Sequence, residues 1–411
     1  MADVSAARRV AELAARRSYG KLVAILAARS GDLAGAEDAL AEAFRAALEQ
    51  WHERGVPSTP EAWLLTVARR RWVDAIRDRR LHEAAARHFQ VMEELSDVPD
   101  ESSLPDRRLE LLFACAHPAI DAAARAPLML QAVLGFDAAT IASAFLVAPT
   151  SMGQRLVRAK NRIRQAGIGF RPPARADLPA RLDAVLDAVY ACFAEGWSDA
   201  EGVDPQRRNL AEEAIYLGQL VAHLLPGEPE ALGLLALMLH AHARRGARRS
   251  PAGAYVPISE QDTRLWDAPM IDEAERLLLR ARDLGRFGRF QLEAAVQSAH
   301  NERRTGRPVA WAAIVSLYDA LLELTRSPVT AINRAIALSQ TAGAAAGLAA
   351  LELLASDKRV QDYQPYWAAR AELLARTGSF GDARDAYQRA VGLERDPAVR
   401  RFLLGRMETG T

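Results

Sequence analysis

The sequence predicts an all-α protein, and two observations carry that prediction. Apolar residues recur at spacings of three and four along almost the whole chain, which is the period of one face of an α-helix. Strict alternation of apolar and polar residues over the length of a strand is absent. With 411 residues, 50% of them hydrophobic, the chain is long enough for several domains that each bury a core of their own.

Charge and cysteine content exclude several classes of protein. The chain has 53 Lys plus Arg and 52 Asp plus Glu, which gives a formal net charge of +1. Its two cysteines, Cys115 and Cys192, are too few for a disulfide framework or a cysteine-based zinc site. No run of about 18 apolar residues occurs, and the N-terminal arginines stand within an amphipathic pattern. We therefore expect a cytoplasmic protein with no membrane association.

Residues 36–51 predict the first amphipathic helix. Its charged residues, among them Glu37, Asp38, Glu42 and Arg45, lie away from the apolar stripe. The stripe consists of Ala36, Leu40, Phe44, Ala47, Leu48 and Trp51. We expect this helix to pack on one side and to face water or a partner on the other.

Residues 60–80 predict a second helix, which follows a break at Gly55, Pro57 and Pro60. Its expected buried face consists of Leu64, Val67, Ala68, Trp72, Ala75 and Ile76. Its expected exposed side is crowded with Arg69, Arg70, Arg71, Arg77, Arg79 and Arg80. Guanidinium groups attract phosphate by charge and by forked hydrogen bonds, and adjacent tryptophans can support unstacked bases. Taken alone, the same surface is equally consistent with a solvated basic face.

Residues 135–164 have the spacing of a helix-turn-helix. Asp137 can cap a short helix, a turn follows at 147–149, and Pro149 begins a longer helix. The expected inward residues are Ile141, Ala142 and Phe145 in the short helix and Met152, Leu156 and Ile163 in the long one. The outer stripe of the long helix consists of Ser151, Gln154, Arg155, Arg158 and Arg162. This stripe suits DNA recognition, because short polar groups can approach base edges while arginines hold phosphates. A basic helix that only faces solvent is the alternative.

Composition divides the chain into five segments. An acidic stretch with prolines and serines marks one linker, and a cluster of glycines and prolines marks another. The segments are 1–90, the acidic linker 91–106, a compact helical unit 107–168, the linker 169–178 and a helical extension 179–411. A loop rich in Arg, Gly, Ser and Pro interrupts the extension at 244–257.

The end of the extension contains a faint repeat with a shift of about 34 residues, the period of tetratricopeptide repeats. Its better copy places packing residues where that motif needs them, at Trp367, Ala371, Leu374, Ala383, Tyr387 and Ala390. An alanine-rich bundle with chance self-similarity is the alternative. Both interpretations predict stacked helical hairpins.

Catalytic chemistry has little support in the sequence. The chain has no glycine-rich phosphate loop, no His-Glu-x-x-His and no nucleophile elbow. His240 and His242 are two residues apart, so on a helix they point in different directions and cannot share a metal without other ligands. Cys115 stands in an apolar helix end, where a buried, inert thiol is expected. We expect no catalytic residue, no cofactor and no bound metal.

Several dispersed motifs resemble one known family. Residues 36–44 (AEDALAEAF) and 62–69 (AWLLTVAR), with Asp74 and Arg77, resemble sigma domain 2 of the extracytoplasmic-function (ECF) group of bacterial RNA polymerase sigma factors. The helix-turn-helix resembles their sigma domain 4. A subgroup of this family carries a long tetratricopeptide-like C-terminal extension. The stretches that resemble this subgroup are 111–119, 144–147, 154–160, 230–239, 261–267, 317–322 and 333–335.

The resemblance implies roles for the segments and their residues. It places sigma domain 2 in 1–90, sigma domain 4 in 107–168 and the extension in 179–411. The residues implied in binding polymerase are Glu37, Asp38, Leu40, Glu42 and Phe44. Those implied in opening the promoter minus-ten element and capturing a flipped base are Ser58, Thr59, Arg69, Arg70, Arg71, Trp72, Arg77 and Arg80. Those implied in reading the minus-35 element are Thr150, Ser151, Gln154, Arg155 and Arg158.

The implied partners are core RNA polymerase, through its beta-prime clamp helices and beta flap, and promoter DNA. A regulatory protein could bind the extension, which is expected to set the activity. Two other interpretations stay open. A helix-turn-helix regulator with a sensing helical-repeat domain would bind DNA without joining polymerase. A helical-repeat adaptor with solvated basic helices would show no salt-dependent affinity for DNA.

Overall fold

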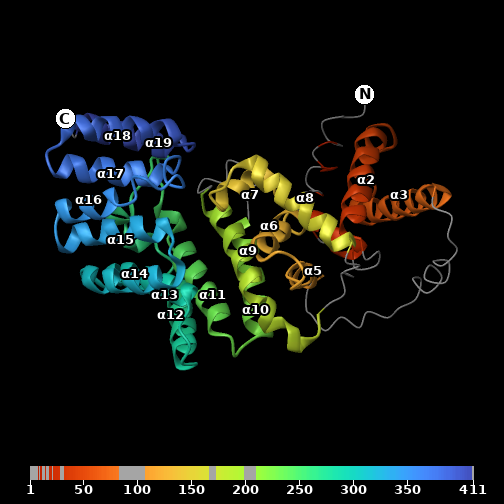
Figure 1. The fold of residues 1–411 in the computed structure, drawn as a ribbon, viewed down its shortest axis with the longest axis horizontal. Coiled ribbons are helices and arrows are strands. Elements are labelled where there is room, and N and C mark those ends of the chain that lie inside the picture. The colour runs from red at the N-terminus through yellow and green to blue at the C-terminus, as the bar shows by residue number, and fades with distance from the viewer. Residues whose placement is uncertain are drawn as a thin grey trace. The chain divides into compact units, whose positions relative to one another are not determined.

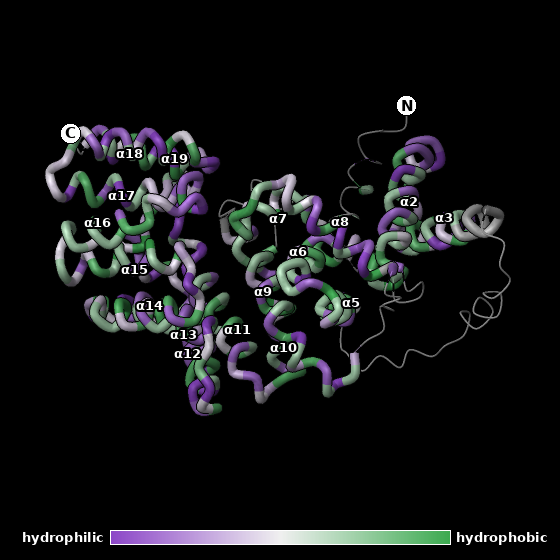
Figure 2. The backbone as a smooth tube through the Cα atoms, in the orientation of Figure 1, coloured by the Kyte–Doolittle hydropathy of each residue, from purple (hydrophilic) through white to green (hydrophobic). Residues whose placement is uncertain are grey.

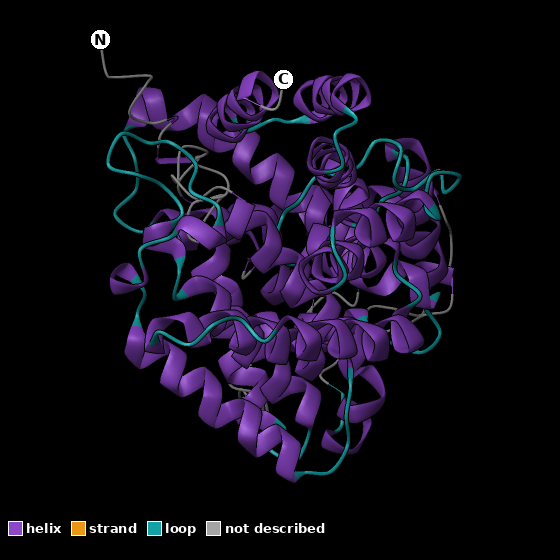
Figure 3. Cartoon of the chain, turned by 90° about the vertical axis from the view of Figure 1, so that its left-hand side faces the viewer, coloured by secondary structure: helices purple, strands orange, loops and turns teal. Residues whose placement is uncertain are grey.

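The computed structural model describes residues 32–82, 107–165, 173–198 and 210–409, together with 8, 10–11, 14, 18–20 and 22–27. Within these residues the regular elements are helices, no strand is formed, and one isolated bridge joins Arg249 to Tyr255 (Figures 1 and 3). The all-α prediction is confirmed. The chain divides into two compact units, here called the first unit (1–192) and the second unit (193–411). No helix of the described part combines the length and the apolarity that a membrane crossing requires.

The structure gives bounds for seven α-helices of the first unit, the last of which, α9, continues into the second unit. They are α2 (Leu33–Arg54), α3 (Pro60–His82), α5 (Arg107–Cys115), α6 (Ala122–Ala132), α7 (Ala138–Ala144), α8 (Pro149–Gln165) and α9 (Leu178–Ser198). Helix α2 packs along α3, and α8 packs against both α6 and α7.

Helix α2 begins where the Asp32 carboxylate accepts a hydrogen bond from the Gly35 amide at 3.0 Å, and it ends at Gly55, whose φ is 83°. The prediction of a buried stripe is confirmed for Ala36, Leu40, Ala47 and Trp51. It is wrong for Leu48, which is 50% exposed. The buried face is centred instead on a row of small residues, which let neighbouring helices approach closely. That row includes Ala39, Ala43 and Ala46.

Helix α3 is anchored by Leu64 and Ala68, which are fully buried as predicted. Val67 and Trp72 are half-buried, whereas the prediction is wrong for Ala75, which is exposed because the packed face ends before it. The side chain of Ile76 lies outside the described residues. At the start of α3, Trp63 packs edge to face against Trp51 of α2, with ring centroids 5.4 Å apart.

The predicted short helix, turn and long helix are present as α7 and α8. The Asp137 carboxylate accepts a hydrogen bond from the Thr140 amide at 2.8 Å, as the capping prediction requires. Helix α7 closes with two crossed bonds, from the Leu146 amide to the Ser143 carbonyl and from the Val147 amide to the Ala142 carbonyl. This closure needs a left-handed residue, and Leu146 takes that role with a φ of 51°.

The packing predicted for the helix-turn-helix is confirmed. Its fully or almost fully buried residues are Ile141 and Ala142 of α7 and Met152, Leu156 and Ile163 of α8. Phe145 is half-buried at the turn. The packed side of α8 therefore fixes which of its other side chains face outward.

The second unit contains ten described α-helices. They are α10 (Leu210–Leu224), α11 (Pro229–His242), α12 (Ala268–Asp283), α13 (Arg289–Asn301), α14 (Trp311–Thr325), α15 (Pro328–Thr341), α16 (Ala344–Glu352), α17 (Gln364–Arg376), α18 (Phe380–Leu393) and α19 (Pro397–Thr409). Helix α11 is buried along most of its length and is surrounded by α10, α12 and α13. From α14 to α19 each helix packs on the next, as successive hairpins (Figure 1). Each of these helices carries both hydrophilic and hydrophobic residues, as expected for amphipathic helices that pack on one side (Figure 2).

The start of α13 is capped from another helix. Its N-cap, Gly288, has no side chain to offer, and the Glu230 carboxylate of α11 accepts hydrogen bonds from the amides of Phe290 and Gln291 at 2.8 and 3.1 Å. Gly233 lets the two backbones meet, because a Cβ there would lie 2.7 Å from the Gln291 nitrogen. Two members of the predicted 230–239 motif therefore join α11 to α13.

The packing predicted for the better repeat copy is confirmed at the hairpin of α17 and α18. One cluster contains the buried residues Ala371, Leu374, Ala383, Tyr387 and Ala390, with Trp367 packed against it. The predicted loop at 244–257 contains a single 3-10 turn at Arg245–Ala247 and the bridge from Arg249 to Tyr255.

Candidate nucleic-acid interface

Helix α3 presents a continuous arginine surface. The side chains of Arg69, Arg70 and Arg71 are exposed. Ser58 and Thr59, in the loop before the helix, are also exposed, and the Thr59 carbonyl accepts a hydrogen bond from the Trp63 amide at 3.2 Å. The loop and the arginines thus belong to one rigid element. Two further predicted DNA contacts, Arg77 and Arg80, lie on α3, but their side chains are outside the described residues.

Trp72 is oriented differently from the arginines. Its indole packs at the start of α2, where Nε1 lies 3.2 Å from the place that a Cβ on Gly35 would occupy. Nε1 is buried and has no hydrogen-bond partner among the residues that the structure describes. Part of this ring therefore supports the contact between α2 and α3, and only its remaining surface is open to a base.

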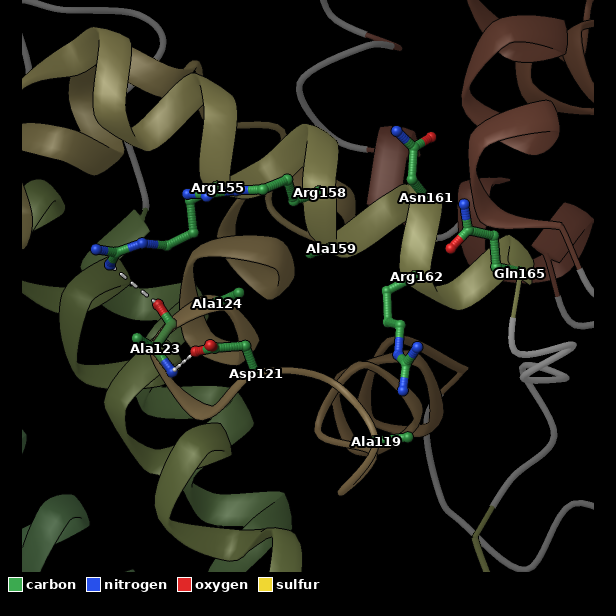
Figure 4. A pocket seen from close by; sticks show the side chains of 10 residues that line it. All are labelled: Ala119, Asp121, Ala123, Ala124, Arg155, Arg158, Ala159, Asn161, Arg162 and Gln165. Carbon is green, nitrogen blue, oxygen red and sulfur yellow. Dashed lines mark hydrogen bonds between the residues drawn. The ribbon is translucent and has the colours of Figure 1, made fainter.

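Helix α8 carries the second predicted DNA surface. Thr150, Ser151, Gln154 and Arg158 are exposed along it. Arg155 is half-buried, and its guanidinium donates a hydrogen bond to the Ala123 carbonyl at 3.2 Å (Figure 4). This bond holds α8 to the start of α6, so Arg155 combines a structural contact with its predicted DNA contact.

An open cavity of about 830 Å³ lies between α8 and the segment that leads into α6. Three arginines of α8 line it, Arg155, Arg158 and Arg162, and Arg162 points from the helix toward Ala119 (Figure 4). The one carboxylate in the lining, Asp121, accepts the Ala123 amide at 2.8 Å and caps α6. The cavity therefore has the charge and the donors to hold a phosphate group. The sequence predicted the arginines but not the opposite wall, because most of that wall, 120–124, lies outside the motifs.

The predicted polymerase-binding residues of α2 have unequal access. Asp38 and Glu42 are exposed and Phe44 is half-buried, whereas Leu40 is completely buried and supports the helix from within. The neighbouring Arg45 donates to the Glu42 carboxylate at 2.8 Å and lowers the pKa of that carboxyl. Leu48, exposed one turn after Phe44, extends the apolar part of this surface.

Glu37, the remaining residue of that set, is covered. Its carboxylate accepts a hydrogen bond from the Nζ of Lys160 in α8 at 2.6 Å. The two predicted binding surfaces, on α2 and α8, are thus in direct contact in this structure.

Cys115 and His240, which the sequence offered as candidates for chemistry, are buried and pack inside the protein. Cys115 is a free, fully buried thiol whose pKa is raised by burial. His240 is fully buried, its Nδ1 accepts a hydrogen bond from the Asn301 amide at 3.0 Å, and burial followed by Arg244 and Arg304 lowers its pKa to about 3. Among the described residues, no group of three or more His, Cys, Asp or Glu side chains is placed to hold a metal.

Comparison with known proteins concerns both units. Residues 14–82, which contain α2 and α3, match sigma-70 region 2. The chain is 39% identical over 367 residues to an uncharacterized protein of Rhizobium meliloti (strain 1021), and the match covers 87% of this chain and 86% of the relative. The chain belongs to the sigma-70 family. The region 2 match supports a role as a sigma factor in transcription initiation.

A second family model matches this sigma factor beyond region 2. Residues 181–282, from α9 to α12, match a family of unknown function (DUF6596). No solved structure matches the chain. The helix-turn-helix of α7 and α8 lies outside both matched ranges, so its role depends on its own geometry.

Proposed function

We propose that the chain is an ECF-type sigma factor of the subgroup with a tetratricopeptide-like extension. It binds core RNA polymerase in the cytoplasm and directs it to promoters. In this proposal sigma domain 2 occupies 1–90, sigma domain 4 occupies 107–168, and the two are joined by the acidic linker 91–106. After the linker 169–178, the extension 179–411 sets the activity.

The observation that carries the proposal is the outer surface of α8. An N-terminal turn with exposed Thr150, Ser151 and Gln154 continues into exposed Arg158 and Arg162, on a helix whose opposite side is buried. Polar groups at the start of a recognition helix can reach base edges in the major groove, while the arginines further along bind phosphates. We assign minus-35 recognition to this surface, with Arg155 and the arginine-lined cavity beside it.

The surface of α3 supports the assignment of the minus-ten element. Exposed arginines at 69–71 follow a loop with exposed Ser58 and Thr59, so phosphate-binding charge lies beside a short polar loop. Arg77 and Arg80 continue this helix, and Trp72 supports it from the side of α2. An opened strand could lie along such a surface with one base held by the loop.

Polymerase binding is assigned to α2. The exposed acidic residues Asp38 and Glu42, with the partly exposed Phe44 and its neighbour Leu48, combine charge and apolar contact. Leu40 holds this surface in place, and Glu37, which is bound by Lys160 in this structure, completes the assigned set. The expected docking sites are the beta-prime clamp helices for α2 and the beta flap for 107–168.

Regulation is assigned to the extension. Its hairpins from α14 to α19 provide the type of repeated helical surface that binds proteins. A chain that ends after α9 retains the hydrogen bond from Arg181 to the Phe113 carbonyl at 3.0 Å, which ties α9 to α5. We expect such a chain to keep the first unit folded and to transcribe at a changed level.

Run-off transcription with purified core polymerase tests the proposal. The wild-type protein is compared with the double variant Arg70→Glu and Arg71→Glu, which reverses two exposed charges on α3. We expect promoter-dependent transcripts from the wild type and a loss of at least tenfold in the variant.

The matched control is Arg400→Glu with Arg401→Glu, two adjacent exposed arginines in α19. This control should transcribe at the wild-type level. Binding of DNA without any transcript from core enzyme would instead support a helix-turn-helix regulator that acts without joining polymerase.

A further inference from the structure

The arginine-lined cavity beside α8 has the dimensions of a small-molecule site. Its volume of about 830 Å³ falls within the range of roughly 300 to 1,000 Å³ that such sites occupy. One wall is α8, and the other is the segment that leads into α6 together with the first turn of that helix (Figure 4). A single phosphate of a DNA backbone would fill only a small part of this space.

The wall opposite α8 is held in a fixed shape by arginines that bind its backbone. Arg125 donates hydrogen bonds to the carbonyls of Pro118 and Ile120, both at 3.0 Å. Arg155 reaches across from α8 and donates to the Ala123 carbonyl at 3.2 Å. Carbonyl groups that are bound in this way do not turn toward an anion and repel it. The cavity is therefore preformed, which lowers the cost of binding a ligand.

Positive charge dominates the lining of the cavity. Arg155, Arg158 and Arg162 follow one another at spacings of three and four residues, so they lie on the same side of α8. Like charges at these spacings repel one another. Against these three charges the lining places one carboxylate, that of Asp121, which caps α6. An anion bound in the cavity would relieve the repulsion among the arginines.

The spacing of the arginines indicates an anion longer than one phosphate group. Arg155 and Arg162 are two helical turns apart, which corresponds to roughly 10 Å along the axis. Each guanidinium offers a fork of donors that fits two oxygens of one phosphate. Three forks in a row therefore match two linked phosphate groups better than a single one.

Small side chains keep the cavity open. The wall opposite α8 carries Ala119, Ala123 and Ala124, and Ala119 is exposed at the place toward which Arg162 points (Figure 4). These alanines form an apolar surface between charged groups, which suits the face of a nucleoside. A longer side chain at Ala119 would occupy the space in front of Arg162.

We propose that the cavity is a binding site for a diphosphate group, carried either by free pyrophosphate or by a nucleotide, and that this ligand competes with DNA for Arg155 and Arg158. The competition rests on the proposed function, which assigns these two arginines to the minus-35 element. A diphosphate in the cavity neutralises the charge that attracts DNA phosphates. It therefore lowers the affinity of the free protein for promoters.

Isothermal titration calorimetry of the full chain measures the site directly. Pyrophosphate is titrated at physiological salt, and inorganic phosphate is titrated at the same ionic strength. We expect one pyrophosphate per chain, bound at least tenfold more tightly than phosphate. Equal affinities for the two ions, or an absence of saturable binding, would overturn the proposal. ADP and GDP distinguish the two sources, because tighter binding than pyrophosphate identifies a nucleotide and weaker binding identifies the free ion.

Variants of the two walls separate a cavity from a helix that is only charged. Ala119→Leu fills the space and keeps every arginine, so its affinity for pyrophosphate should fall at least tenfold. Ala122→Leu changes an exposed alanine outside the lining and should bind as the wild type does. Arg158→Gln with Arg162→Gln should also lose at least tenfold. Unchanged affinity in Ala119→Leu would show that the charge of α8 is sufficient, and would overturn the assignment to the cavity.

Competition with duplex DNA separates this inference from the proposed function. Pyrophosphate should displace labelled DNA from the wild type at concentrations where sulfate of equal ionic strength does not, and Ala119→Leu should resist this displacement. If pyrophosphate binds and DNA does not, the proposed function fails and the site stands. If DNA binds and pyrophosphate does not, the inference fails alone. Simultaneous binding of both would contradict the competition for Arg155 and Arg158.

Discussion

Arginine has different roles in the two units. In the second unit many arginines are paired with carboxylates or buried, and examples of the pairs are Arg304 with Asp272, Arg334 with Asp319, Arg370 with Glu352 and Arg406 with Glu372. On α3 and α8, by contrast, the exposed Arg70, Arg71, Arg158 and Arg162 form no ion pair within the part of the chain that the structure describes. The same residue type stabilises one unit and presents charge on the other. A net charge of +1 conceals this difference.

Arg244 is the extreme case of a structural arginine. It is 5% exposed, and its guanidinium donates to Asn301 at 2.6 Å and to Gln297 at 2.5 Å, beside the ring of Trp266. Arg244→Ala would leave the buried amide oxygen of Asn301 and the half-buried amide oxygen of Gln297 without this donor, so we expect the free energy of unfolding to fall by about 3 kcal/mol. Urea unfolding followed by circular dichroism measures this change.

The control for Arg244 is Arg307→Ala. Arg307 is 72% exposed and 3.9 Å from Glu302, so its removal should change the stability by no more than about 0.5 kcal/mol. If the two variants unfolded at the same urea concentration, the distinction between buried and surface arginines in this unit would be lost.

The arginines around His240 also predict a dependence on pH. Burial, then Arg244 and Arg304, lower the pKa of His240 to about 3, whereas an unfolded histidine titrates at about 6.5. Between pH 6.5 and about 3 this histidine is protonated in the unfolded chain, whereas His240 of the folded chain stays neutral. Stability is therefore complete above pH 6.5 and is lost as the pH falls toward 3, by about 2 kcal/mol at pH 5 from this group.

Chemical unfolding at a series of pH values from 8 to 5 checks this prediction. His240→Gln should reduce the loss between pH 6.5 and 5, although it lowers stability at pH 7. An identical loss in the variant would show that His240 is not the group responsible.

The exposed arginines of α8 should affect DNA binding and not stability, in contrast to Arg244. Arg158→Gln with Arg162→Gln should leave the unfolding curve unchanged, because both side chains are exposed. Affinity for duplex DNA should fall by about tenfold, and the slope of log K against log salt should decrease by about 2. Fluorescence anisotropy at several salt concentrations measures both quantities.

The matched control for these two is Arg400→Gln with Arg401→Gln in α19. It removes the same charge from the extension and should leave the affinity and the salt slope unchanged. Equal losses of DNA affinity in the two double variants would indicate that only net charge matters, and would contradict the assignment of DNA binding to α8.

The smallest expected effect concerns the turn that holds α8. Leu146 has a φ of 51°, a region that costs a residue with a side chain roughly 1 kcal/mol. Leu146→Gly should therefore be more stable than Leu146→Ala by about 1 kcal/mol, since both lose the leucine side chain and only glycine relieves the backbone. Thermal unfolding of the two variants tests the turn without changing any arginine.

Local patterns in the sequence were sufficient to predict the helices and the Asp137 cap. They also predicted the packing of α8 and of the hairpin of α17 and α18. They failed at Leu48 and Ala75, because the buried face of a helix is decided by its neighbours and not by its own spacing alone. The Glu37–Lys160 pair and the bond from Arg155 to Ala123 could not be predicted, since the two partners of each contact are distant in sequence and no pattern links them. The roles of the individual site residues stay predictions.

The cap on α13 constrains how the extension can be divided. The carboxylate of Glu230 accepts hydrogen bonds from amides that lie 60 and 61 residues later. The start of α13 therefore needs α11 for its cap. A recombinant fragment cut anywhere between Glu230 and Phe290 would expose unsatisfied donors at a helix start. The boundaries of an expressed fragment are better placed before α10 or after α19. During synthesis, α11 can complete its packing only after α13 has been made.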